Sequence, residues 1–255
     1  MIEIQNLVKQ YGDKNAVNNL SLSVGKGEIF GFLGPNGAGK STTVKILTGM
    51  VFPTSGLARV AGFNIVTDPI EVKKRIGYVP ESGALFESLT GREYLQLVAD
   101  LHHLDAEIAE KRSIEFLSLF DLQESQHERI QQYSKGMKQK ILIAAALMHN
   151  PDVLFLDEPM NGLDSNASLI FKELLKKLSA QGKTIFFTSH ILDVVERVCT
   201  RIAIINNGSM LIDGTALEIL QATGEKSLEE AFAKLTGVRD AKESAQEFMN
   251  AMGKQ

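Results

Sequence analysis

The sequence has very little cysteine and no long apolar run. Cys199 is the only cysteine among 255 residues, so an internal disulfide is impossible, and no Cys/His cluster has the spacing of a metal site. The longest uninterrupted apolar run, residues 141–148, is far shorter than the roughly 20 residues that span a bilayer, and Met1 leads directly into a strand pattern instead of a signal peptide. We therefore expect a protein of a reducing compartment, whose membrane contacts are made through a partner.

An excess of positive charge is also missing. The formal net charge is −4 and the pI is near 5.8, which argues against a broad electrostatic grip on nucleic acid. A chain of this length can form one large α/β domain, alone or with a small appendage, but hardly two large domains. No internal repeat, heptad run or low-complexity tract is present. These properties favour a small anion or another protein as the binding partner.

The most informative segment is a glycine-rich turn within residues 29–42, IFGFLGPNGAGKST. Gly34, Gly37 and Gly39 have no Cβ atom, so the backbone can bend tightly and direct several N–H groups toward an anion. The helix expected to follow adds the positive end of its dipole, and Lys40 adds a full charge. This segment therefore predicts a phosphate site.

The spacing of this turn fits the pattern G-x-x-x-x-G-K-[ST]. In that pattern the lysine reaches the β- and γ-phosphates of a nucleotide, and the next hydroxyl, here Ser41, reaches a bound Mg²⁺. The flanks agree, because residues 29–33 read as a buried strand and residues 42–47 open an amphipathic helix. The plainer alternative is a glycine-rich turn without a ligand. We expect nucleotide to contact the residues of this turn, Asn36, Gly37, Ala38, Gly39, Lys40, Ser41 and Thr42.

A second signal is a pair of acids, Asp157 and Glu158, at the end of an apolar strand predicted over residues 153–158. An acid that orients the metal is needed at about this distance downstream of a phosphate loop. We expect Asp157 to hold Mg²⁺ or its waters. Side chains alternate along an extended chain, so Glu158 should point elsewhere and accept a proton from the attacking water. The alternative is an acidic pair at a helix N-terminus.

Two rings are further candidates for this site. His190 follows a buried strand at residues 184–188, and open α/β sheets keep their ligands at the carboxyl ends of strands, where an imidazole can hydrogen-bond a γ-phosphate or a water. Tyr11 lies on a predicted polar loop before the phosphate turn and could stack on adenine; the alternative is a half-buried surface tyrosine. The remaining histidines are interpreted as surface or capping residues, and they are His102, His103, His127 and His149.

The other segments indicate an α/β fold with inserted helices. Strand patterns cover residues 2–8, 17–24, 56–61 and 76–79, and a hairpin joins 201–206 to 209–213 around Asn207-Gly208. Helices are expected at 90–101, at 166–181 and from 227. The helix at 166–181 has Ile170, Leu174 and Leu178 on one apolar stripe. Residues from about 84 to 147 are predicted to be a helical insert in which Ser134 caps a helix. Residues 236–255 are predicted to form a polar, loosely held helical tail.

Five motifs in this order resemble the ATP-binding subunit of ABC transporters. They lie at residues 34–41, 133–139, 156–158, 161–164 and 189–190. The resemblance spans about residues 2–235 and implies a P-loop NTPase core of the ABC ATPase type, with an antiparallel β subdomain and a helical insert. Tyr-Ser-Lys-Gly-Met at 133–137, where the family has Leu-Ser-Gly-Gly-Gln, and Pro-Glu at 80–81 look most like the multidrug and natural-product exporter branch.

The resemblance implies a head-to-tail dimer, formed with a second copy or a homologous ATPase subunit. Two ATP molecules lie at such an interface, each between the phosphate loop of one subunit and the signature helix of the other. Ser134, Lys135, Gly136 and Asp164 would then contact the nucleotide across the interface. The helix N-terminus at Ser134 is a reasonable anion site in physical terms as well.

One position departs from the family. Glu81 stands where most members have a glutamine that contacts Mg²⁺ and the attacking water. A glutamate keeps an oxygen of nearly the same reach and adds a negative charge, which Mg²⁺ favours. We expect Glu81 to face the metal, directly or through one water; the alternative is that it points into solvent.

The resemblance also implies a separately encoded transmembrane permease as partner, a peripheral position on the cytoplasmic side of the membrane, and ATP hydrolysis that powers export. A different class remains open, the ABC ATPases that act on nucleic acid or ribosomes. Those usually carry long coiled-coil insertions or two cassettes, and this sequence has neither. A regulatory subunit with little turnover is a third option, which Glu158 and His190 disfavour.

Overall fold

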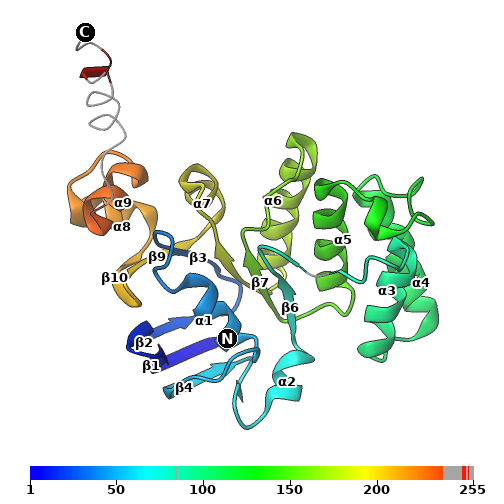
Figure 1. The fold of residues 1–255 in the computed structure, drawn as a ribbon, viewed down its shortest axis with the longest axis horizontal. Coiled ribbons are helices and arrows are strands. Elements are labelled where there is room, and N and C mark those ends of the chain that lie inside the picture. Colours follow the sequence, from blue (N-terminus) through cyan, green and yellow to red (C-terminus); the bar gives the residue numbers. More distant parts are fainter. Residues whose placement is uncertain (84, 238–248, 251, 253–255) are drawn as a thin grey trace.

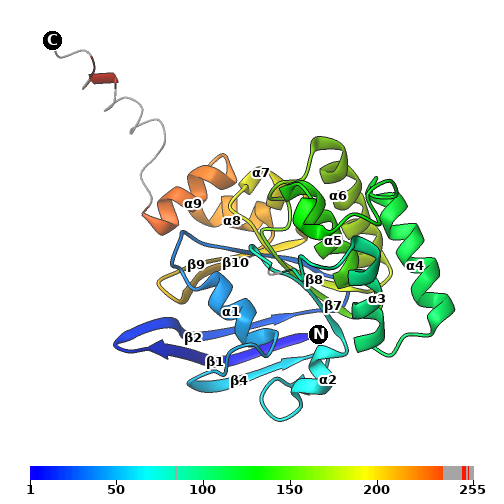
Figure 2. The same ribbon diagram turned by 45° about the vertical axis from the view of Figure 1, so that its right-hand side comes forward.

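The structure, a computed structural model, describes residues 1–83, 85–237, 249–250 and 252. Its strands form a four-stranded sheet in the order β2-β1-β4-β5 and a six-stranded sheet in the order β10-β9-β3-β8-β7-β6. Figure 2 shows the four-stranded sheet and α1 on one side of the six-stranded sheet, with α5 and α6 on the other. The predicted α/β fold class is confirmed. None of the described helices is long and apolar enough to cross a membrane.

The four-stranded sheet is antiparallel. β1 (Ile2–Tyr11) pairs with β2 (Lys14–Val24) and β4 (Ser55–Val60), and β5 (Phe63–Asn64) pairs with β4. The first two strands are longer than predicted because Gly12, at φ 55°, lets the chain reverse within two residues. Tyr11 is therefore the last residue of a strand, paired with Lys14, and the prediction that it lies on a loop is wrong.

The six-stranded sheet is parallel except at one edge, where β10 runs antiparallel to β9. All residues of β3, β7 and β8 are buried, as expected for parallel strands covered on both faces. The predicted Asn207-Gly208 hairpin is confirmed, with φ values of 48° and 78°. The strands are β3 (Ile29–Leu33), β6 (Ile76–Val79), β7 (Val153–Asp157), β8 (Thr184–Thr188), β9 (Arg201–Asn206) and β10 (Ser209–Gly214).

Among the described residues, six helices flank or connect the strands of the core (Figure 1). They are α1 (Lys40–Leu47), α2 (Pro69–Lys73), α6 (Ser165–Ala180), α7 (Leu192–Val198), α8 (Ala216–Thr223) and α9 (Leu228–Thr236). The sequence patterns did not predict α7 and α8, which have only seven and eight residues. The prediction of a helical tail after residue 237 falls largely outside the described residues.

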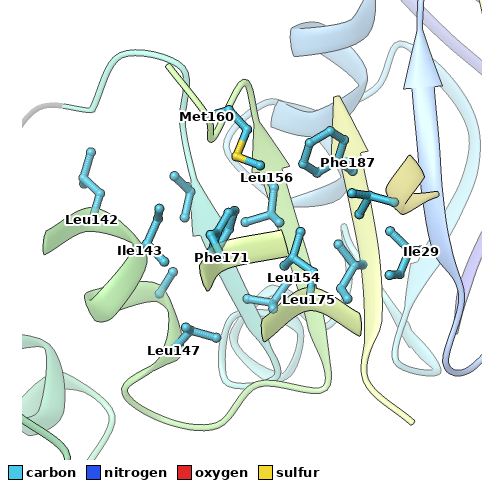
Figure 3. Close-up of a cluster of buried hydrophobic side chains, with 14 of the residues drawn as sticks. Ile29, Leu142, Ile143, Leu147, Leu154, Leu156, Met160, Phe171, Leu175 and Phe187 are labelled. Atoms are coloured by element: carbon cyan, nitrogen blue, oxygen red, sulfur yellow. The ribbon is translucent and has the colours of Figure 1, made fainter. Parts of the chain in front are cut away.

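The buried face of α6 differs slightly from the predicted stripe. Phe171 and Leu175 are fully buried in the core between α5, α6 and the sheet, where Figure 3 shows them beside Leu154 of β7. Leu174 and Leu178, which were expected on the buried stripe, are only partly buried. The helix therefore faces the sheet about one position further along, with the large Phe171 ring at the centre of the contact. Each such buried side chain stabilises the fold by roughly 1.5–3 kcal/mol.

Residues 85–147 are mainly helical and contain α3 (Gly91–Leu101), α4 (Ala106–Leu119) and α5 (Lys135–Leu147). The capping box predicted at Thr90 is present, because Thr90 and Glu93 satisfy each other's backbone N–H groups. Ser134 caps α5 by accepting a hydrogen bond from the Met137 N–H at 3.2 Å. The last turns of α5 pack against the sheet, where Figure 3 shows Ile143 and Leu147 near Leu154. Helix α5 thus joins the insert to the core.

Two of the four histidines interpreted as surface or capping residues are packed together, and one of them, His102, is the C-cap of α3. The rings of His102, at the end of α3, and His149, just after α5, stack with centroids 3.7 Å apart and planes inclined by 9°. Nε2 of His149 lies 2.9 Å from the Ile76 carbonyl oxygen, and its Nδ1 is buried without a hydrogen-bond partner. Burial lowers the pKa of His149 to about 4, and the charges of His102, Arg112 and Lys183 act in the same direction. His149 is therefore a neutral packing residue.

This packing predicts a pH-dependent stability. Because the folded pKa of His149 lies below the ordinary histidine value of 6.5, the unfolded chain binds a proton that the folded chain does not. The free energy of unfolding should fall as the pH drops from about 6.5 toward 4, by on the order of 2 kcal/mol for this partly exposed ring. Urea unfolding at several pH values measures this change in the free energy of unfolding. The wild type is compared with His149→Asn, and His127→Asn is the surface control. An unchanged pH slope in His149→Asn would contradict the interpretation.

Candidate functional site

A cleft of about 650 Å³ lies at the carboxyl ends of the parallel strands. It is open to solvent and is bounded by the β1–β2 hairpin, the glycine-rich turn, the segment after β6 and the ends of β7 and β8. The structure therefore brings together residues that are up to 179 positions apart in the sequence. Those lining the cleft are Tyr11, Lys14, Ala16, Asn36, Gly37, Gly39, Lys40, Ser41, Thr42, Glu81, Asp157, Glu158 and His190.

The glycine-rich turn depends on two residues without a Cβ atom. Gly37 and Gly39 have φ values of 80° and 108°, which L side chains rarely adopt. A Cβ on Gly39 would also come closer than 3.0 Å to the carbonyl oxygen of Ala16. The turn is braced from the other side, because Gly208 in the β9–β10 hairpin donates its N–H to the Ala38 carbonyl at 2.8 Å. The backbone is thus held in a conformation that surrounds an anion.

Lys40 lies at the start of α1 and points back into this turn. Its Nζ donates to the carbonyl oxygens of Gly34 at 2.6 Å and Pro35 at 3.2 Å. Burial lowers the pKa of Lys40, and the carboxylates of Glu158, Asp157 and Glu81 oppose that change. The cation is therefore already positioned beside the backbone N–H groups that would bind phosphate.

Thr188 at the end of β8 holds both acids of β7. Its Oγ1 donates to Oδ1 of Asp157 at 2.5 Å, and the Glu158 N–H approaches its carbonyl and hydroxyl oxygens at 3.2 and 3.3 Å. Asp157 and Thr188 are direct partners in the parallel register of β7 and β8. One oxygen of Asp157 is thereby fixed, which leaves Oδ2 as its second oxygen for another ligand.

Glu158 is oriented by a backbone turn, so the expectation of an extended, alternating chain is wrong. Strand β7 ends at Asp157, and Glu158 has a φ of 52°, in the left-handed region that non-glycine residues seldom adopt. Its side chain is only 9% exposed, and its Oε2 lies 2.8 Å from Nδ1 of His190, a side chain that is 63% exposed. The pair joins a buried carboxylate to a ring at the mouth of the cleft.

Negative charge gathers on the side of the cleft near β6. Burial, followed by the charges of Asp157 and Glu81, raises the pKa of Tyr78 to about 12. Glu81 itself is exposed and lines the same cleft as Ser41 and Asp157. This side of the cleft therefore collects hard oxygen donors, the type of ligand that divalent magnesium prefers.

Tyr11 lies at the opposite rim. Its ring is half exposed, and Nζ of Lys9 lies 4.9 Å from the ring centroid. A cation over one face of the ring leaves the other face for a planar ligand. The position is compatible with the predicted base stacking.

The structure does not bring all the predicted residues into this cleft. Ala38 is buried, and its N–H donates to the Pro35 carbonyl at 3.1 Å. Asp164 caps α6 through the Ala167 N–H at 2.8 Å and pairs with Lys140 at 3.0 Å. Three others lie at the N-terminus of α5, away from the cleft of their own chain, and these are Ser134, Lys135 and Gly136.

Sequence reasoning missed three residues of the site, Lys14, Ala16 and Thr188. Lys14 and Ala16 line the cleft because the β1–β2 hairpin reaches over the glycine-rich turn, and only the pairing of Lys14 with Tyr11 could have indicated it. Thr188 had no signal beyond its place two residues before His190. Its hydroxyl contact depends on strand register, which a single sequence does not reveal.

The ABC transporter family model matches residues 17–161, more than half of the chain. The chain belongs to the ABC transporter family. Linearmycin resistance ATP-binding protein LnrL of Bacillus subtilis (strain 168) is 40% identical over 224 residues, which cover 88% of this chain and 72% of that protein. ABC transporter ATP-binding protein NatA of the same strain is 38% identical over 226 residues, covering 86% of this chain and 91% of that protein.

Solved structures agree with this membership. A structure of an ATP-binding subunit of an ABC transporter has a TM-score of 0.88 at 32% identity, covering 92% of this chain and 99% of that chain. A dimeric post-hydrolysis state of the ATP-binding cassette MJ0796, bound to ADP and Pi, has a TM-score of 0.78 at 28% identity, covering 84% and 98%. This ABC transporter subunit is an ATP-binding cassette and an ATPase by family.

The two strained glycines predict different costs of substitution in this cassette. Gly39→Ala should lower the free energy of unfolding by about 3 kcal/mol or more, because a left-handed alanine must also displace the Ala16 carbonyl. Gly37→Ala should cost only about 1 kcal/mol, because no atom lies within 4 Å of its Cβ position. Urea unfolding without nucleotide compares them. Equal losses in the two variants would show that the Ala16 contact does not constrain the turn.

Proposed function

We propose that this chain is the ATP-hydrolysing subunit of an exporter, and that the cleft described above is its hydrolytic site. The observation that carries the proposal is the convergence of Lys40, Asp157 and Glu158 at one edge of the parallel sheet. A phosphate-binding cation, a metal-orienting acid and a general base are the groups that phosphoryl transfer to water requires.

The phosphates of ATP are assigned to the glycine-rich turn. Its backbone N–H groups from Asn36 to Thr42, except that of Ala38, together with the α1 N-terminus and Lys40, present positive charge to the same volume. Ala38 contributes through the shape of the loop, because its own N–H is already bonded to Pro35. Tyr11 is assigned to stack on the adenine ring through the face of its own ring that Lys9 does not cover.

Magnesium is assigned to the hydroxyl of Ser41 and the carboxylates of Asp157 and Glu81. These are hard oxygen donors on one side of the cleft, and Oδ2 of Asp157 is not used by Thr188. No group of three or more His, Cys, Asp or Glu side chains in the described residues could hold a metal alone, which fits an ion that shares its ligands with a nucleotide. The ion neutralises phosphate charge when bound.

Glu158 is assigned as the base that takes a proton from the attacking water. Its carboxylate is buried, held by the left-handed backbone, and placed beside the metal-orienting acid. His190 is assigned to position the γ-phosphate and the water. When Nδ1–H donates to Glu158, Nε2 of the exposed ring remains available to another partner. It accepts a hydrogen bond when the ring is neutral and donates one when the ring is protonated.

A second copy or a homologous subunit would complete each site. Ser134, Lys135, Gly136 and Asp164 lie outside the cleft of their own chain, and we assign them to the nucleotide held by the partner, in a head-to-tail dimer. Residues 1–235 form the ATPase domain in this proposal, with the insert at about 84–147. The dimeric state of the cassette MJ0796 supports the assembly.

The transport role rests on the names of the relatives. LnrL is a linearmycin resistance protein, and a protein 37% identical over 221 residues is a Nod factor export ATP-binding protein of Burkholderia orbicola. We infer that this chain likewise drives export, together with a separately encoded transmembrane permease at the cytoplasmic face of the membrane. Nothing in the comparisons favours a role on nucleic acid or ribosomes.

The assignment of Glu158 is tested by Glu158→Gln. The variant should bind ATP with unchanged affinity and hydrolyse it about 10²–10⁴ times more slowly, because the amide cannot accept the proton. Single-turnover phosphate release and fluorescent nucleotide binding measure the two quantities. Glu196→Gln, the same change on the exposed side of α7, is the control. Near-normal turnover of Glu158→Gln would remove Glu158 from the role of base.

The assignment of Glu81 is tested by the Mg²⁺ dependence of hydrolysis. Glu81→Gln should stay active but need about two- to fivefold more Mg²⁺ for half-maximal rate, because one exposed charge near the metal is lost. Glu81→Ala should lose both hydrolysis and transport coupling. Superimposable Mg²⁺ titrations of the wild type and Glu81→Gln would leave Glu81 without a metal role.

A further inference from the structure

A second cleft, of about 180 Å³, lies where the helical insert meets the core. It is far from the phosphate turn in the fold, because it is built at the amino ends of β7 and β8, whereas the nucleotide cleft lies at their carboxyl ends. Its apolar side chains come from four elements, and they are Phe116 of α4, Leu147 of α5, Leu154 of β7, and Leu174 and Leu178 of α6. Figure 3 shows Leu147 of α5 and Leu154 of β7 in the same buried cluster.

Two cations stand at the rim of this cleft, one on each side of the junction. Arg112 belongs to α4 of the insert and donates from Nη1 to the Met148 carbonyl at 2.6 Å. Lys183 precedes β8 in the core and donates to the Asn150 carbonyl at 3.0 Å. Both side chains are thus tied to backbone oxygens, which fixes their charges in place without neutralising them.

The carboxylate nearest to these cations compensates them only in part. Asp152 lies 3.5 Å from Lys183 and is 51% exposed, whereas the Lys183 side chain is only 16% exposed. A half-exposed acid at this distance is well screened by water. The two cations also contribute to the low pKa of His149, after its burial and the neighbouring His102. The rim of the cleft is therefore positive.

We propose that this cleft is a binding site for a small amphipathic carboxylate, whose aryl or short alkyl part fills the apolar floor while its carboxylate lies between Arg112 and Lys183. A cavity of about 150 Å³ lined by Leu, Ile and Phe is large enough for benzene, so 180 Å³ suits one ring. Arginine and lysine are the side chains that recognise a carboxylate by charge-assisted hydrogen bonds. The ligand would join the insert to the core, because Arg112 belongs to the insert and Lys183 belongs to the core.

The probe for this site is 3-phenylpropionate, compared with the neutral 3-phenylpropan-1-ol and with acetate. Methyl NMR of the full chain, with ADP present to fill the nucleotide site, follows Leu154, Leu174 and Leu178. We expect a Kd for 3-phenylpropionate on the order of 1 mM. The alcohol should bind about fivefold more weakly, because it lacks the carboxylate and so loses the binding free energy of one exposed ion pair. Acetate should cause no shift of these methyl groups.

Two further measurements locate the carboxylate of the bound ligand in the cleft. Lys183→Gln should weaken 3-phenylpropionate about fivefold and leave the alcohol unchanged, whereas Lys176→Gln, a charge loss on the exposed face of α6, should change neither. Bound 3-phenylpropionate should also raise the pKa of His149, because it brings a negative charge to the two cations that lower it.

The proposal is overturned if acid and alcohol bind equally well, or if neither shifts these leucine methyl groups at ~10 mM, about ten times the expected Kd. It is also overturned if the shifts appear only around the nucleotide cleft. The comparison of ligands on the wild type decides the matter even where Lys183→Gln fails to fold. None of these results bears on the proposed hydrolytic function, because hydrolysis is not measured.

Discussion

The parallel pairing of β7 and β8 is the constraint on which the nucleotide cleft depends. Their register sets Thr188 directly opposite Asp157, and Thr188 then fixes the Asp157 carboxylate and the Glu158 N–H with its own hydroxyl and carbonyl groups. β3 pairs with the other side of β8, so the turn that carries Lys40 leaves the sheet at the same edge. Because side chains alternate along a strand, a slip of one residue would reverse this arrangement. The geometry of the proposed hydrolytic site is thus a product of sheet register and the core that maintains it.

The charges of the cleft support the proposed Mg²⁺ ion. Two lysines and three carboxylates line it, so a polyanionic nucleotide enters a site whose carboxylates outnumber its lysines by one. Coulomb repulsion between carboxylates and phosphates is strong in a partly buried site, and a divalent cation between them converts it to attraction. Glu158 carries a further cost, because its left-handed backbone is strained by about 1–3 kcal/mol. Strain of this kind persists only where packing over-determines it, as β7 and β8 do here.

Much of this could be predicted from the sequence because the decisive signals are local. The spacing of Gly34 to Ser41 fixes a loop conformation, and buried strands of five residues are visible as apolar runs. The features that the sequence did not predict depend on tertiary context. The left-handed turn at Glu158, the contacts of Thr188 and the stacking of His149 on His102 each join segments that are far apart in the chain or set by packing. Tyr11 was placed on a loop because a two-residue reversal at Gly12 leaves almost no signal of its own.

We propose that each hydrolytic site is completed by Ser134 and its neighbours from a second copy, since these residues lie outside the cleft of their own chain. The direct test is the mass of Glu158→Gln in solution by sedimentation, with and without Mg²⁺ and ATP. We expect a monomer without nucleotide, a dimer with it, and a monomer again when Ser134→Arg is added to a variant that still binds ATP. A dimer that survives Ser134→Arg, or a monomer at saturating ATP in Glu158→Gln, would contradict it.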